Sequence, residues 1–92
     1  MSRVDANLLA RLPLEDVQKV TFYKRDELTT DLICCDVVIG EQVWSFHEEL
    51  VGWDLLMAHV SALPGFRSDW FEAVSQPAFV ISETEAFSRP EK

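Results

Sequence analysis

Residues 43–70 read VWSFHEELVGWDLLMAHVSALPGFRSDW, and this stretch decides the fold because an alternating pattern of side chains gives way to a helical one within it. Over residues 42–47 the side chains alternate with a period of two, which is typical of a pleated strand. Trp44 and Phe46 fall on the same side of that strand. The stretch therefore predicts a strand that packs through an aromatic side.

A helix is predicted to follow this strand, over residues 52–63. Gly52 can turn the chain without steric cost, and Pro64 with Gly65 can end the helix. Between them, five apolar residues recur at helical spacing and form one stripe: Trp53, Leu56, Met57, Val60 and Leu63. A helix of about three turns is marginal alone in water, so the stripe is expected to dock on a sheet.

Two more strands are predicted on the N-terminal side of this stretch. Residues 17–24 are rich in β-branched and aromatic side chains, and residues 29–39 form the longest β-rich run. Gly40 and Glu41 then lead into the strand at 42–47 with the short spacing of a hairpin. These three strands are expected to form an antiparallel meander.

The C-terminal part predicts a second, short helix and a last strand. Asp69 and Glu72 resemble a capping box, and the helix that they begin is expected to end near Ser75. Residues 78–87 alternate as an edge strand does, with glutamates that discourage unwanted pairing. The predicted fold class is α+β, an antiparallel sheet made of a three-strand meander plus a C-terminal strand, packed by one amphipathic helix and a short second helix.

Length and composition favour one domain. The 92 residues are 48% hydrophobic and 11% aromatic, which suits a single core over residues 1–92. Residues 1–12 are expected to form an N-terminal arm and residues 88–92 a loose tail. No apolar run approaches the roughly 20 residues of a membrane span, and the first residues lack the apolar block of a secretory signal. A cytoplasmic location is therefore expected.

The chain is strongly acidic. Sixteen Asp and Glu against eight Lys and Arg give a formal charge of −8. This charge repels phosphate groups, so it argues against nucleic acid and against an anionic membrane, and it favours a basic partner. A simpler interpretation is that the carboxylates keep a small protein soluble.

One polar cluster is a candidate acid/base or metal site: His47, Glu48, Asp54 and His59. A zinc motif of the form H-E-x-x-H would need a second histidine at position 51, where the chain has Val51. Glu48 is therefore interpreted, with Glu49, as a charge near the start of the helix. No catalytic residue, metal or cofactor is assigned.

Other motifs for chemistry are missing from the sequence. The three glycines are isolated and cannot form a phosphate-binding loop. Cys34 and Cys35 are adjacent in a predicted strand, so their side chains point to opposite faces. We interpret them as two buried, small hydrophobic residues rather than a disulfide or metal site.

Three aromatic residues after the Pro-Gly break are candidates for a binding groove: Phe66, Trp70 and Phe71. Tryptophan is favoured at binding hot spots, and a peptide or a second subunit could cover these rings. The first functional hypothesis is thus a non-enzymatic binding or protein-interaction module, which could form a homodimer. The alternatives are an acidic inhibitor or immunity-type protein for a basic partner, and a small enzyme with an acid/base site around His47 and Asp54.

Three segments carry a resemblance to known proteins: FYKRDELTTDLICCDV, WSFHEELVGWDLLMAHVSALPGF and DWFEAVSQPAF. Together they resemble a group of small bacterial conserved proteins, to which no activity is attached. The W-x-F-H-E-E turn followed by G-W-D is also similar to the end of bacterial pleckstrin-homology-like domains. Such a domain ends with its helix, whereas this chain continues into a second helix and a strand. This departure argues against a complete pleckstrin-type barrel, and the resemblance transfers no functional residue.

Overall fold

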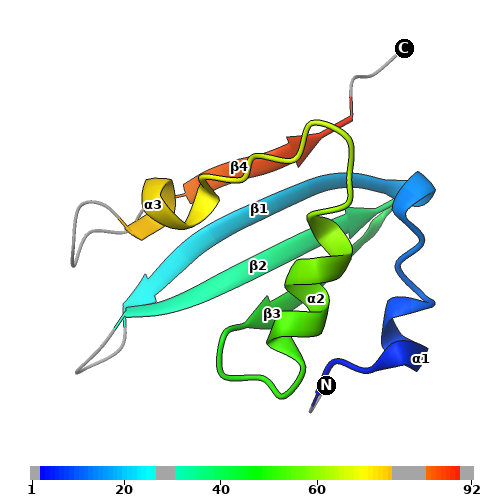
Figure 1. Ribbon diagram of the computed structural model, residues 1–92, viewed down its shortest axis with the longest axis horizontal. Coiled ribbons are helices and arrows are strands. Elements are labelled where there is room, and N and C mark those ends of the chain that lie inside the picture. The colour runs from blue at the N-terminus through cyan, green and yellow to red at the C-terminus, as the bar shows by residue number, and fades with distance from the viewer. Residues whose placement is uncertain (1–2, 27–30, 76–82, 90–92) are drawn as a thin grey trace.

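The computed structural model describes residues 3–26, 31–75 and 83–89. Four strands, β1 (Val17–Asp26), β2 (Asp31–Ile39), β3 (Gln42–His47) and β4 (Glu83–Ser88), form one antiparallel sheet in the order β3-β2-β1-β4 (Figure 1). The predicted α+β fold, with a three-strand meander and a C-terminal strand, is confirmed. Residues 29–30 and 78–82 of the predicted strands lie outside the described residues.

The helices are short. They are α1 (Ala6–Leu9), the 3-10 turn η1 (Leu14–Asp16), α2 (Trp53–Val60) and α3 (Trp70–Ser75). The amphipathic helix α2 ends three residues earlier than predicted, because the N–H of Leu63 bonds to the carbonyl of Val60 in a tighter turn. In Figure 1 α2 crosses one face of the sheet, and the chain between α2 and α3 runs beside β4.

The core lies between the helices and one face of the sheet, which we call the inner face. Phe22 of β1, Cys35 and Val37 of β2 and Phe46 of β3 are buried on it, as the alternation of each strand requires. Leu56 and Val60 of α2 complete this cluster, and Trp53 and Met57 pack against it half-buried. The apolar stripe of the helix therefore docks on the aromatic side of the sheet, as the sequence predicts.

The N-terminal arm is part of this core. Val4 and Leu12 are both buried, and the N–H of Val4 donates to the carbonyl of Val51 at 2.7 Å. Asp5 caps α1 by accepting a bond from the N–H of Leu8. Of the tail predicted at 88–92, Ser88 ends β4 and the N–H of Arg89 bonds to the carbonyl of Gln18, while residues 90–92 lie outside the described residues.

Two stretches of sheet edge are covered. The register of β4 against β1 shifts at Ala86, and the carbonyl of this bulged residue accepts the N–H of Arg67 at 2.8 Å. At the other edge, β2 extends beyond β3, and Glu48 bonds to Ile33 there. None of the described helices is long and apolar enough to cross a membrane.

Candidate functional site

The four residues of the polar cluster face separate surroundings. The Nε2 of His59 lies 2.7 Å from the carbonyl oxygen of Leu12, so this histidine ties α2 to the N-terminal arm. Asp54 is exposed in the first turn of α2. His47 ends β3 opposite Cys34. No hydrogen bond or ion pair joins any two of the four side chains, all of which the structure describes.

Glu48 has a structural partner that the sequence did not indicate. Its Oε1 accepts the N–H of Ile33 at 3.0 Å, and its own N–H donates to the Ile33 carbonyl at 3.0 Å. Glu48 thus satisfies the edge of β2 where β3 has ended, rather than serving only as a charge near the helix start. Among residues 3–26, 31–75 and 83–89, no group of three or more His, Cys, Asp and Glu is placed to hold a metal ion.

Two of the three aromatic candidates contact Phe22, and the third packs on one of these two. The ring of Trp70 stacks on Phe22 with centroids 3.8 Å apart, and Phe66 meets the same ring edge-on at 6.3 Å. Phe71 packs edge-on against Trp70 and keeps 54% of its surface exposed. Trp70 therefore holds α3 on the core, Phe66 holds the chain before α3, and Phe71 is the member of the three that is largely open to a partner.

The two cysteines are free and buried, and they lie on opposite faces of β2. Burial raises the pKa of the Cys35 thiol above its ordinary range, with the nearby Asp36 acting in the same sense. A thiol of this kind is a poor nucleophile, because the thiolate is the reactive form.

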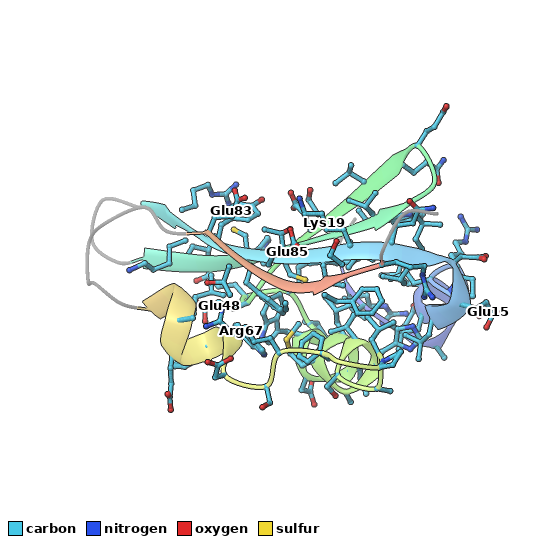
Figure 2. All side chains as sticks on the ribbon, turned by 90° about the horizontal axis from the view of Figure 1, so that it is seen from above. Glu15, Lys19, Glu48, Arg67, Glu83 and Glu85 are labelled. Atoms are coloured by element: carbon cyan, nitrogen blue, oxygen red, sulfur yellow. The ribbon has the colours of Figure 1, made fainter. Side chains whose placement is uncertain are left out.

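The sheet face opposite the helices, which we call the outer face, carries a hollow that the sequence analysis missed. The hollow has a volume of about 320 Å³ and is lined by residues of all four strands: Lys19, Thr21, Tyr23, Asp36, Val38, Val43 and Glu83. In Figure 2 Lys19 and Glu83 lie on the side of the sheet away from α2 and α3, and the end of the β2–β3 hairpin curls toward that same side. The curled hairpin makes this face concave.

Hydrogen bonding and charge organise the outer face. Tyr23 donates its hydroxyl to Oδ1 of Asp36 at 3.1 Å, across the β1–β2 pair. Lys19 forms an ion pair with Glu85 at 3.5 Å, which is exposed and weak. Glu83 lies directly opposite Tyr23 in the register of β4. The charge of Lys19 is balanced by Glu85, so the carboxylates of Asp36 and Glu83 make the hollow negatively charged.

Burial, followed by the charge of Asp36 and its hydrogen bond, raises the pKa of Tyr23 to about 12, and the nearby Arg25 acts in the opposite sense. The ordinary tyrosine pKa is about 10. Because the folded state holds this proton more tightly, the stabilising contribution of Tyr23 is complete below about pH 10 and is lost as the pH rises toward 12.

We expect Asp36→Asn to lower the pKa of Tyr23 toward its ordinary value, since it removes both the charge and the strongest acceptor. Tyr23 is the one tyrosine of the chain, so the rise in tyrosinate absorbance with pH reports it directly. Asp54→Asn, which removes an equal charge from the helix side, is the control and should leave the titration unchanged. If the titration of Tyr23 has the same midpoint pH in the wild type and in the Asp36→Asn variant, the hydrogen bond between Tyr23 and Asp36 is refuted.

Comparison of this chain with protein-family models, with curated proteins and with solved structures finds no significant match. The candidate site therefore rests on the geometry of this chain alone.

Proposed function

We propose that this chain is a non-enzymatic protein-interaction module that receives a basic side chain of a partner protein in the hollow of its outer face. The observation that carries the proposal is the hollow itself, because it lies on the face that the helices leave open. A single-layer sheet face in a small domain is either solvated or covered by a partner. The concave shape and the mixed lining favour the partner.

The lining suits the two parts of a lysine or arginine side chain. Val38 and Val43 lie directly opposite each other, and Val43 keeps 59% of its surface exposed. They offer an apolar wall to the methylene stem of such a side chain. The carboxylates of Asp36 and Glu83 offer acceptors for its cationic end, and the bond from the Tyr23 hydroxyl holds the Asp36 carboxylate in place.

The overall charge supports the same partner. At a formal charge of −8, the chain attracts basic surfaces and speeds their association by electrostatic steering. The acidic inhibitor or immunity-type hypothesis is a narrower form of this proposal, in which the basic side chain belongs to the substrate groove of an enzyme. Both forms predict an affinity that falls as salt is added.

The test is a titration of isotope-labelled protein with two capped peptides of glycine and serine, one with a central arginine and one with a central glutamate. We expect the arginine peptide alone to shift the backbone amide signals of Tyr23, Asp36 and Val38. Asp36→Asn should weaken its binding by about tenfold to a hundredfold, since a hydrogen bond to a charged group contributes about 1.5 to 3 kcal/mol.

Asp54→Asn is again the matched control, because it removes one carboxylate from the opposite side of the molecule. Equal loss of binding in the two variants would mean that only net charge matters. Equal shifts with both peptides, or shifts spread over the helices, would contradict a site in the hollow.

A further inference from the structure

Along the outer edge of β3, none of the described residues outside the sheet forms a hydrogen bond with the backbone of Val43 or Ser45. The β4 edge is met by Arg67, and β2 beyond β3 is met by Glu48. At the end of β3, the carbonyl of His47 accepts the N–H of Leu50 in the turn after the strand. Val43 also lines the hollow and Ser45 lies opposite Asp36, but a contact through the backbone edge of β3 uses none of the carboxylates of the hollow, so it does not rest on the proposed function.

The composition of β3 differs from that of the other edge strand. Residues 42–47 read QVWSFH and contain no formally charged side chain at neutral pH, whereas β4 carries Glu83 and Glu85. Val43 and Ser45 are exposed on it. Natural edge strands that must stay single are usually protected by charges or by cover, and β3 has neither in the described part of the chain.

The register tells which backbone groups of β3 point outward. Ile39 and Gln42 close a two-residue turn, so they form a hydrogen-bonded pair and every second residue of β3 then bonds to β2. The bond from the N–H of Glu48 to Ile33 continues the same alternation. The N–H and C=O groups of Val43 and Ser45 therefore face away from the sheet.

We propose that β3 pairs antiparallel with β3 of a second copy of the chain, in a register centred on Trp44. In this register Val43 of each copy lies opposite Ser45 of the other, and the two pairs exchange four backbone hydrogen bonds. The outward groups of Val43 and Ser45 in both copies are then satisfied. Continued past the strand, the same register brings Glu41 of the turn toward His47 of the second copy, whose imidazole can donate to a carboxylate.

The negative charge of the two chains weakens this dimer. Two chains of formal charge −8 repel each other, but charges in water are screened beyond a Debye length of about 8 Å at physiological salt. The neutral strand lies at the contact, so added salt strengthens the dimer. Binding of a basic partner in the hollow responds to salt in the opposite direction, and the two proposals can fail separately.

Sedimentation of the full chain at rising concentration and at two salt concentrations tests the dimer. The expected result is a dimer with a Kd in the micromolar range that tightens with salt. Ser45→Pro removes an outward N–H and should abolish the dimer, while an unchanged circular dichroism spectrum shows that the fold is intact. Ser45→Ala keeps the N–H and should dimerise as the wild type does. A monomer at every concentration and salt overturns the proposal.

The register has its own test, which does not depend on tolerance of proline. Val43→Lys with Ser45→Glu places opposite charges across the contact, and Val43→Lys with Ser45→Lys places like charges there. The first double variant should dimerise about tenfold more tightly than the second, because two attractive cross-strand pairs replace two repulsive ones. Equal Kd values, or a tighter dimer of the all-lysine variant, overturn the register.

Discussion

Gly52→Ala is expected to lower the free energy of unfolding by about 3 kcal/mol or more, because two costs fall on one position. Gly52 has a φ of 89°, which side chains rarely adopt. An added Cβ would also collide with the backbone carbonyl of Val4. Val4 cannot easily move aside, since it is buried and its N–H is bonded to Val51.

Gly40→Ala separates these two costs. Gly40 has a φ of 59°, but an added Cβ would meet nothing within 4 Å. Only the backbone cost remains, so a loss of about 1 kcal/mol is expected. Urea unfolding of the two variants measures the difference. If the two variants lose the same free energy of unfolding, the N-terminal arm can move away from position 52 at no cost, and its packing there contributes little to stability.

Phe22→Ala is expected to cost about 3 to 5 kcal/mol, enough to unfold a marginally stable domain of this size. Phe22 is fully buried at the centre of the sheet. Its ring meets three others, stacking on Trp70 and lying edge-on to Trp53 and Phe66. The substitution therefore removes the surface on which both α2 and α3 pack.

Phe71→Ala is the matched control, because the same side chain is removed from an exposed place on α3. With 54% of its surface exposed and its ring packed against Trp70, it should cost less than about 1 kcal/mol. Thermal unfolding followed by near-ultraviolet circular dichroism compares the two. A Phe22→Ala variant as stable as the Phe71→Ala variant would contradict the central position of Phe22.

The strands and the main helix could be predicted because their patterns are local. The alternation around Trp44 and Phe46 and the stripe through Leu56 and Val60 each need only neighbouring residues to be recognised. The hairpin at Gly40 is local for the same reason. The pairing of β4 with β1 could not be predicted in this way, since the residues that meet there lie far apart in the chain, as Lys19 and Ser88 do.

The candidate site was less predictable, because its residues become neighbours only through register and curvature. Tyr23 and Asp36 are thirteen positions apart, and neither stands in a recognisable motif. In the sequence, the residues of the outer face look like the polar side of any strand, and this pattern is the same for a flat sheet and for a curved one. The role of Glu48 could not be predicted for the same reason. A glutamate before a helix indicates a charge at the helix start, whereas the bond from Ile33 to Glu48 depends on where β3 ends.

The place of β1 inside the sheet has a consequence for synthesis on the ribosome. Its partner β2 is the next strand of the chain, but its other partner β4 is made only after β3, α2 and α3. Until β4 pairs with it, β1 has one unpaired edge, and a strand of another polypeptide could add there. Pairing β4 with β1 brings together residues as distant in the chain as Lys19 and Ser88, so we expect the docking of β4 to be a slow, entropy-limited step of folding.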